Sequence, residues 1–329
     1  MTATMTNGDG LVSIVILTHD NWPDLELAVE SALAQSWPAK EIIIIDNDSL
    51  DETQSEVEKR YAGRLKYIRQ SNTQDSGGYN RGIRESRGEF VQLLDGDDFL
   101  APNKVARQMA VFAADPAADI VYGETRQFQA GSGTPEWSDW ETTSQPDMLA
   151  ALIDPAAAGA GLVIHTALFR RRVFEKVGEW DQTLIGADMD FWLRSAWAGC
   201  KFVFSPGAWC FHRRRPGQMS SNTRTMVQRT VRTLEKALSY VDRDPYRMMI
   251  NQRLASLRLG IALTDMELDR SSALHELRLA RKHDSHRVGP FSYALAQALI
   301  RMPGARRLIK HPLMASLRQP AARALRVTG

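Results

Sequence analysis

The chain has 329 residues, 43% of them hydrophobic, which is enough for one large or two ordinary domains with buried cores. Its formal net charge of +2 is unevenly distributed. Residues 1–270 hold 30 Lys and Arg against 37 Asp and Glu, a net charge of −7, whereas residues 271–329 hold 11 Lys and Arg against 2 Asp and Glu, a net charge of +9. This distribution suggests a basic tail that binds an anionic partner. The two cysteines, Cys200 and Cys210, show neither a zinc spacing nor a disulfide framework and fit a reducing compartment. Because no stretch approaches the ~20 apolar residues of a membrane span and no signal sequence is present, we expect a cytoplasmic protein.

Apolar strands alternate with helical stretches in the first part of the chain. Residues 11–17 (LVSIVIL) are a continuous apolar run, typical of a strand buried on both faces, and residues 25–33 carry apolar side chains at helical spacing. Further strands are predicted at residues 42–45, 65–69, 90–94 and 119–122, with a helix after Pro102. This alternation predicts right-handed βαβ units and a mostly parallel sheet, whose ligands bind beyond the carboxyl ends of the strands.

Three polar clusters follow predicted strands, namely Thr18-His19-Asp20, Asp46-Asn47-Asp48 and Asp95-Gly96-Asp97-Asp98. The third runs an apolar strand into three carboxylates, which repel one another and need water, a basic side chain or a metal ion as a partner. Hard oxygen ligands at the edge of a sheet suit Mg²⁺ or Mn²⁺ held together with substrate phosphates. A helix cap or a turn remains the alternative for any single cluster. The sequence has neither a G-x-x-x-x-G-K-[ST] loop nor a G-x-G-x-x-G after the first strand.

The pattern becomes helical from Met226 onward, so we place a domain boundary near residue 220, with residues 1–220 as the first domain and 221–329 as a helical region. Apolar residues recur at helical spacing between Phe291 and Met302 and are followed by a basic run. Two interpretations of this tail stay open. It could be an interfacial helix on anionic lipid at the inner face of the membrane, or part of a helical bundle that packs on the first domain or forms a homo-oligomer.

Four motifs, in order and spacing, carry a resemblance: VSIVILTHDN, IIIIDNDSLDET, GGYNRGIRESRGEFVQLLDGDD and ADMDFWLR. Over roughly residues 11–220 the chain resembles the inverting glycosyltransferases of family 2, which have a GT-A fold. The resemblance implies a Rossmann-like, mostly parallel sheet flanked by helices and followed by an all-helical C-terminal region. It also implies transfer of a sugar from a nucleotide diphosphate donor with a divalent metal ion.

The resemblance assigns donor-binding residues one by one. Thr18 and Asp20 lie where the first loop of the family touches the nucleotide, and Gly78 belongs to the donor-binding GGYN segment. Asn47 stands where the family commonly has an Asp that reads uracil, which puts a uridine donor in doubt and favours thymidine.

The metal and leaving-group assignments concern the carboxylate cluster and a later basic segment. Asp95-Gly96-Asp97 matches the D-x-D signature of the family, with Asp97 as the direct metal ligand and Asp95 in contact with donor and metal. His212 is a further candidate ligand. Arg213 and Arg215 could neutralise the diphosphate leaving group, and a solvated surface is the alternative for both.

The general base is assigned to Asp188 in Ala187-Asp188-Met189-Asp190, where the family has a Glu-Asp motif. Since positions two apart diverge on a helix, only one of the two aspartates can face the site. The alternative is that both are charges favoured at a helix N-terminus. Ala187 replaces the Glu of the family, so any acceptor contact of that side chain is lost.

Together these assignments predict an inverting glycosyltransferase dependent on Mn²⁺ or Mg²⁺ that uses a UDP- or dTDP-sugar. The acceptor is expected to be a glycan or a lipid-linked molecule in cell-surface polysaccharide assembly, with no nucleic-acid partner. Without the Q-x-x-R-W motif of processive synthases, we expect the addition of one or a few sugars. The alternatives are a catalytically silent sugar- or nucleotide-binding module and a sugar nucleotidyltransferase.

Overall fold

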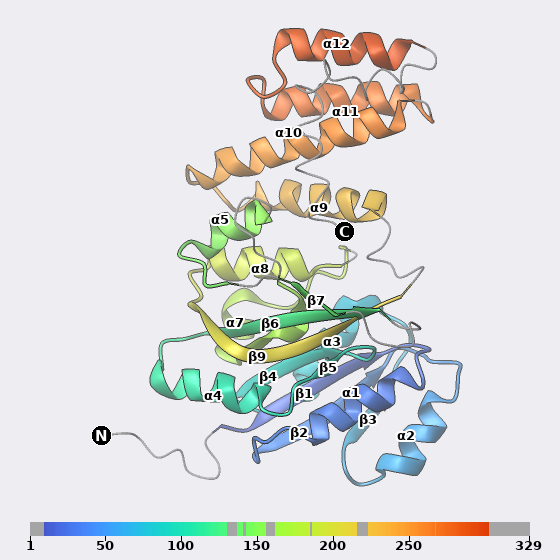
Figure 1. Ribbon diagram of the computed structural model, residues 1–329, viewed down its shortest axis with the longest axis vertical. Coiled ribbons are helices and arrows are strands. Elements are labelled where there is room, and N and C mark those ends of the chain that lie inside the picture. Colours follow the sequence, from blue (N-terminus) through green and yellow to red (C-terminus); the bar gives the residue numbers. More distant parts are fainter. Residues whose placement is uncertain are drawn as a thin grey trace. The chain divides into compact units, whose positions relative to one another are not determined.

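The computed structural model describes residues 10–129, 137–140 (backbone only), 143–155, 162–184, 186–215, 223–266 and 268–302. The chain forms two compact units, which are drawn in Figure 1. The first comprises Met1–Met148 and Gly159–Arg215, and the second comprises Leu149–Ala158 and Pro216–Gly329.

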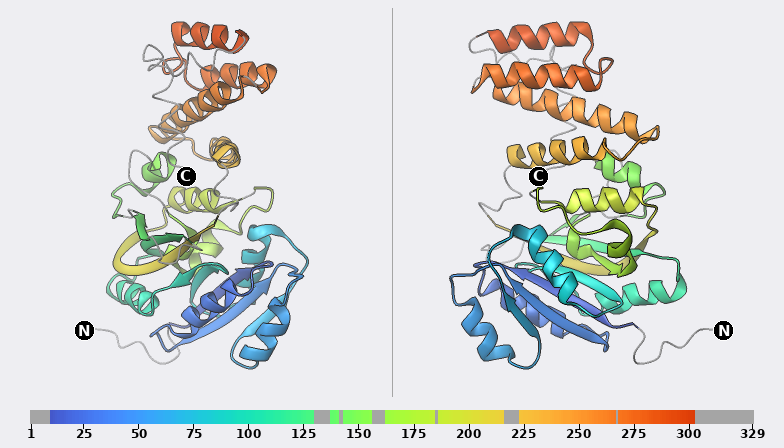
Figure 2. Two further views of the ribbon diagram at one scale, coloured as in Figure 1. Left: turned by 45° about the vertical axis from the view of Figure 1, so that its right-hand side comes forward. Right: turned by 180° about the vertical axis from the view of Figure 1, so that it is seen from behind.

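A nine-stranded sheet forms the centre of the first unit. Four of its strands run parallel in the order β3-β2-β1-β4: β3 (Lys66–Arg69), β2 (Lys40–Asp46), β1 (Val12–Thr18) and β4 (Phe90–Asp95). Helices cover both faces of this parallel part, as Figure 2 shows, and every residue of β1 is buried. Continuous apolar runs are therefore the sequence signal of these strands, because neither face meets water.

Alternate side chains of β1 serve the two faces of the sheet. Ile14 and Ile16 belong to a core cluster with Leu25 and Val29 of helix α1, whereas Val15 faces Gly82 of helix α3, where an added Cβ would lie 2.2 Å from its Cγ1. The helices of this unit are α1 (Asp24–Leu33), α2 (Thr53–Tyr61), α3 (Gln74–Glu85), α4 (Lys104–Ala114), α7 (Arg172–Val177) and α8 (Asp188–Trp197).

The other half of the sheet is mixed and continues in the order β4-β8-β6-β9-β5. β8 is antiparallel to β4 and β6, β9 is parallel to β6, and β7 and β5 add antiparallel pairs to β6 and β9. The pairing of Phe99 with Phe211 places the segment after β4 beside the end of β9. These elements are β5 (Phe99–Leu100), β6 (Ile120–Gln129), β7 (Trp137–Trp140), the 3-10 helix η1 (Ile164–Thr166), β8 (Ala167–Arg170) and β9 (Phe202–Arg214).

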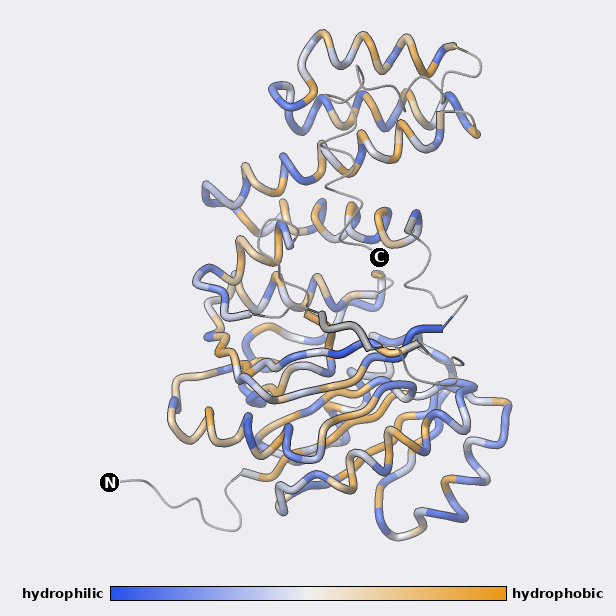
Figure 3. Tube along the Cα trace, viewed as in Figure 1, coloured by the Kyte–Doolittle hydropathy of each residue, from blue (hydrophilic) through white to orange (hydrophobic). Residues whose placement is uncertain are grey.

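The second unit is helical throughout its described residues. It contains α5 (Met148–Ile153), α9 (Thr223–Ala237), α10 (Tyr246–Asp265), α11 (Arg270–His283) and α12 (Pro290–Arg301). Hydrophobic and hydrophilic residues alternate along α10, α11 and α12 in Figure 3, and their apolar side chains form one shared core. The prediction of a mostly parallel sheet flanked by helices and followed by a helical region is confirmed.

Helix α12 contributes to this core through Ala296, Leu299 and Ile300, while Phe291 is 78% exposed. None of the helices in the described part of the chain has the length and apolar character needed to cross a membrane. The basic run predicted after Met302 lies outside the described residues.

Candidate active site

The parallel register brings the three polar clusters to one edge of the sheet. Thr18 pairs with Asp46 at the ends of β1 and β2, and Leu17 pairs with Asp95 at the ends of β1 and β4. The loops that follow stay in contact, because the backbone N–H of Asn47 donates to Thr18 O (2.9 Å) and that of Gly96 donates to Leu17 O (2.8 Å). This edge is where an open α/β sheet binds its ligands.

Two carboxylates of the third cluster reach solvent. The Asp95 side chain is 39% exposed and Asp97 is 21% exposed, whereas Asp98 is fully buried. The hydroxyl of Tyr79 on α3 donates to Asp95 Oδ1. Burial, and then the negative charges of Asp98 and Asp97, raise the pKa of Asp95 well above its usual range. The repulsion expected from the sequence is therefore present at Asp95, where a cation would relieve it.

The carboxylate of Asp98 is bound by other groups of the protein. Its carboxylate accepts from the backbone N–H of Arg213 (2.8 Å) and lies 3.0 Å from Nδ1 of His165 and 3.1 Å from Nδ1 of His212. Burial alone would raise the pKa of Asp98, but the two histidines hold it below its usual range. Burial would likewise lower the pKa of His165, but Cys210 and Asp98 raise it well above its usual range. The ligand atoms of Asp98, His165 and His212 lie within 4.8 Å of one another, close enough to surround a metal ion.

Arg213 in β9 and Arg215 just after that strand contact the same cluster. Arg215 Nη2 lies 2.7 Å from Asp97 Oδ2, and Arg213 Nε donates to the backbone carbonyl oxygen of Asp97 (3.0 Å). Both guanidinium groups also bind Asp24 at the start of α1. The register of β5 against β9 explains this arrangement, because it sets residues 212–215 beside residues 97–98.

The predicted donor-binding residues Thr18, Asp20 and Asn47 make hydrogen bonds within and between the loops that follow β1 and β2. Asp20 lies in the left-handed region (φ 47°), and its Oδ1 accepts from the backbone N–H of Leu50 (2.6 Å). The Thr18 hydroxyl donates to Asn21 Oδ1. Asn47 is buried, with Nδ2 donating to Gln74 O (2.9 Å).

Gly78 lies directly behind Asn47 and packs α3 against β1. An added Cβ there would lie 2.2 Å from Leu17 Cδ1 and 3.2 Å from Asn47 Nδ2. Without a side chain, the helix can approach the ends of the strands. Gly78 therefore allows α3 to pack closely against Leu17 and Asn47. The GGYN motif alone does not indicate this packing role.

Asp188 and Asp190 diverge at the start of α8. Asp190 is fully buried, and its Oδ2 accepts from Arg194 Nε at 2.8 Å. Asp188 is partly exposed, and its charge, after burial and the charge of Asp95, contributes to raising the pKa of Tyr79. Since the Tyr79 hydroxyl binds Asp95, this places Asp188 within electrostatic reach of the carboxylate cluster.

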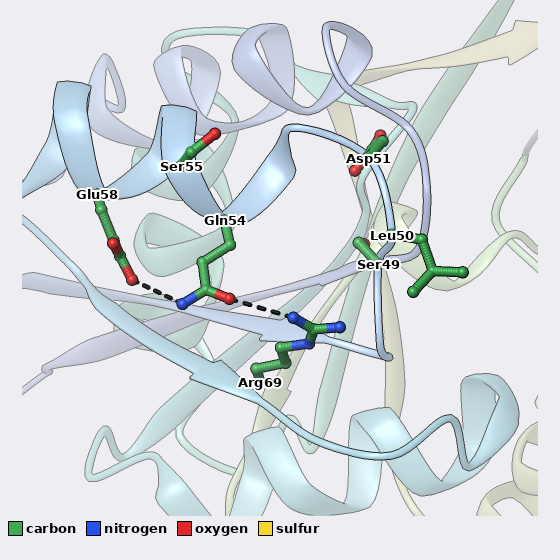
Figure 4. Close-up of a pocket in the computed structure, with 7 residues that line it drawn as sticks. All are labelled: Ser49, Leu50, Asp51, Gln54, Ser55, Glu58 and Arg69. Carbon is green, nitrogen blue, oxygen red and sulfur yellow. Dashed lines mark hydrogen bonds between the residues drawn. The ribbon is translucent and has the colours of Figure 1, made fainter.

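A separate surface hollow of about 440 Å³ lies beside the loop after β2. Figure 4 shows its lining, in which Arg69 donates to Gln54 (3.3 Å) and Gln54 donates to Glu58 (2.8 Å). None of the predicted catalytic, donor-binding or metal-ligating residues lines this hollow. The carboxylate edge of the sheet is therefore the better candidate for the chemistry.

Sequence reasoning missed three residues of the candidate site. Tyr79 lies in a motif that was recognised, and an aromatic hydroxyl before a D-x-D strand could have indicated a partner for it. His165 and Asp24 gave no local signal. Each reaches the cluster through the tertiary fold, His165 from η1 and Asp24 from α1.

Comparison with known proteins places these features in a family. The family model described as glycosyl transferase family 2 matches residues 13–178, which is half of the chain. An uncharacterised glycosyltransferase of Nostoc sp. is 28% identical over 173 residues, covering 50% of this chain and 52% of that protein. Chondroitin synthase of Escherichia coli is 28% identical over 193 residues, covering 57% of this chain and 27% of that protein. The aligned part thus spans about half or less of these two relatives.

Solved structures show the same fold. Staphylococcus aureus TarS 1–349 in complex with UDP aligns with a TM-score of 0.61 at 15% identity, covering 91% of this chain and 90% of that chain. A mannosyltransferase from Pyrobaculum calidifontis in complex with GDP-Man and Mn²⁺ aligns with a TM-score of 0.57 at 18% identity, covering 97% and 88%. The fold is of the GT-A type, and the predicted resemblance is confirmed. The chain belongs to glycosyl transferase family 2.

Proposed function

We propose that this family 2 protein is a metal-dependent, inverting glycosyltransferase, and that it moves a sugar from a UDP- or dTDP-sugar to a glycan or lipid-linked acceptor. The observation that carries the proposal is the convergence at one sheet edge. Two solvent-reachable carboxylates, Asp95 and Asp97, follow β4, and Asp188 acts electrostatically on the tyrosine that binds Asp95. This convergence supports a cation site with a catalytic base close to it.

The donor atoms suit a hard divalent cation. Asp97 and Asp95 could supply carboxylate oxygens, and the buried Asp98 adds a third negative charge beside them that a cation would balance. His212 would add its Nε2, since its Nδ1 lies against Asp98. When bound, Mn²⁺ or Mg²⁺ would supply positive charge that stabilises the departing diphosphate.

The proposed reaction is a single in-line displacement. The acceptor hydroxyl oxygen attacks the anomeric carbon from the face opposite the diphosphate, and the bond between that carbon and the phosphate oxygen breaks. Asp188 accepts the proton of the hydroxyl, and Arg213 and Arg215 offset charge on the leaving diphosphate. Carboxylates are weak bases at neutral pH, so the positioning of donor and acceptor must supply much of the acceleration.

A pyrimidine donor is the proposed nucleotide. The amide of Asn47 can donate and accept hydrogen bonds. In the structure its Nδ2 donates to Gln74 O (2.9 Å) and its Oδ1 accepts from Gln70 (2.8 Å), so a pyrimidine would replace one of these partners. The structural neighbours named above were solved with UDP and with GDP-Man, so the fold accommodates either base. In a competition assay we expect UDP and dTDP to displace a labelled nucleotide more strongly than GDP, and a clear preference for GDP would refute the pyrimidine assignment.

The acceptor proposal rests on the relatives and on the C-terminal part of the chain. Similarity to chondroitin synthase supports a role in polysaccharide assembly. The basic residues 303–329 could hold the enzyme at the inner, cytoplasmic face of a membrane near a lipid-linked acceptor, or the C-terminal helices could form a homo-oligomer.

The decisive experiment for this function is a panel of nucleotide sugars with Mn²⁺, scored first for donor hydrolysis and then for transfer to glycan acceptors. Proton NMR of the first product formed gives its anomeric configuration. We expect turnover with at least one pyrimidine sugar and a product of inverted configuration. A retained configuration would overturn the single-displacement mechanism, and nucleotide binding without turnover would favour a silent binding module.

A further inference from the structure

Asp24 holds two arginines at the mouth of the carboxylate cluster. Its Oδ1 lies 3.1 Å from Arg213 Nη1, and its Oδ2 lies 2.9 Å from Arg215 Nη1. Asp24 is the first residue of α1. Its two carboxylate oxygens each lie against a guanidinium group, one of Arg213 in β9 and one of Arg215 just after that strand.

The two arginines are held to different degrees. Arg213 is 14% exposed: its backbone N–H binds Asp98, its Nε binds the carbonyl of Asp97, and its guanidinium lies 4.9 Å from the centre of the Phe128 ring. Arg215 is 36% exposed and bridges Asp24 and the carboxylate of Asp97. Arg215 is therefore the more exposed of the two guanidinium groups, and it is the one that contacts the carboxylate of Asp97.

Asp97 is also the proposed direct metal ligand, so Arg215 and a divalent cation would compete for the same carboxylate. Two cations at one carboxylate repel each other, and the more exposed, singly charged guanidinium is the one expected to leave. Asp24 would then keep Arg215 beside the cluster. A guanidinium freed from a carboxylate is well suited to bind a phosphate through two parallel hydrogen bonds.

We propose that Asp24 is a positioning residue for Arg213 and Arg215, and that Arg215 exchanges Asp97 for the donor diphosphate when a divalent cation binds. The inference rests on the proposed function. It has a thermodynamic consequence: Arg215 opposes binding of the metal alone and favours binding of the metal together with a diphosphate. Metal and nucleotide diphosphate must therefore bind cooperatively, with Arg215 as the source of the coupling.

Calorimetry tests this on the full chain, with Mn²⁺ alone and then with UDP at saturating Mn²⁺. Arg215→Ala should bind Mn²⁺ alone at least about threefold more tightly, since the partly exposed ion pair of Arg215 with Asp97 opposes metal binding in the native chain. The same variant should bind UDP with Mn²⁺ about tenfold more weakly, because a charge-assisted phosphate contact is lost. Arg214→Ala is the matched control. It removes the same charge from the last residue of β9, and adjacent residues of a strand alternate between its two faces, which sets Arg214 on the face opposite to Arg213. Both of its affinities should stay within about twofold of the native values.

Asp24 is tested in the same assay. Asp24→Asn should weaken UDP binding at saturating Mn²⁺ by about threefold to tenfold, and Asp24→Glu should restore part of the loss, because a carboxylate and not the shape of the side chain is required. The affinity for UMP, which lacks the second phosphate, should fall less in Asp24→Asn than the affinity for UDP.

The outcomes separate the two proposals. If Arg215→Ala and Arg214→Ala bind Mn²⁺ alone equally well while the native chain binds UDP in a metal-dependent way, the exchange is refuted and the proposed function stands. Equal losses of UMP and UDP affinity in Asp24→Asn would refute the positioning role. If the native chain binds neither Mn²⁺ nor UDP, the metal-dependent function and this inference fail together.

Discussion

Asp188→Asn is the substitution that tests the proposed base. It preserves the shape of the side chain at the start of α8 and removes its ability to accept a proton. Because the charge of Asp188 acts on Tyr79, and the hydroxyl of Tyr79 binds Asp95, the residue is close to the donor side of the site without being one of its proposed metal ligands. We expect transfer to fall by about 10²-fold or more, with the affinity for UDP and Mn²⁺ within about twofold of the native value.

Asp190→Asn is the matched control, with the same chemical change two residues along the same helix. Asp190 is fully buried, and its Oδ2 accepts from Arg194 Nε at 2.8 Å. A hydrogen bond to a charged group contributes about 1.5–3 kcal/mol, so we expect the free energy of unfolding to fall by about that amount. Arg194 also donates to the carbonyls of Val177 and Glu179, which should keep α8 in place and preserve turnover of the folded protein.

The assay measures initial rates of sugar transfer per folded molecule, with the folded fraction taken from urea unfolding followed by circular dichroism. The expected pattern is a stable, inactive Asp188→Asn and a destabilised, active Asp190→Asn. If Asp190→Asn abolishes turnover and Asp188→Asn does not, the wrong carboxylate has been assigned as the base.

Two further predictions concern stability and the tail. Lys104 is buried, donates to Gln92 and Gln108, and has a pKa lowered by burial to about 7. A Lys in the unfolded chain keeps its proton to about pH 10.4, so above pH 7 the unfolded state binds more protons than the folded state. The free energy of unfolding should therefore rise by up to roughly 1.4 kcal/mol per pH unit. Lys104→Met should remove this rise in urea titrations between pH 7 and 9, and an unchanged dependence of the free energy of unfolding on pH would contradict the prediction. If the tail contacts lipid, the full chain should float with anionic vesicles at low but not high salt, and removal of residues 303–329 should abolish flotation. Absence of flotation, with an altered oligomeric state on truncation, would support the bundle.

The strand ends of the site were predictable because their signals are local. Continuous apolar runs in β1, β2 and β4 mark strands buried on both faces, and each ends in polar residues. Parallel pairing then brings Thr18, Asp46 and Asp95 to one edge with no further information. Spacing along a helix similarly predicted that Asp188 and Asp190 diverge.

The partners of the carboxylates could not be predicted, because they depend on long-range packing. His165 reaches Asp98 from η1, and Asp24 meets Arg213 and Arg215 only because β5 pairs with β9. Neither a lone histidine nor an Asp at a helix start carries a signal of its own in the sequence.

The tail illustrates how burial changes the interpretation of a pattern. The apolar spacing of α12 suits a membrane surface equally well as a protein core. In the structure Leu299 and Ile300 lie in the core shared with α10 and α11, so a truncation near Asp284 would remove part of that core. A truncation after Met302 leaves it intact and isolates the basic residues.

The central claim is that donor binding depends on a metal ion held at Asp97. The most direct measurement is a calorimetric titration of UDP into the native chain and into Asp97→Asn, each with and without Mn²⁺. We predict that Mn²⁺ strengthens UDP binding by the native chain and that most of this gain is lost in Asp97→Asn, because a neutral amide is a poorer ligand for a hard cation. An equal Mn²⁺-dependent gain in both proteins would contradict the account.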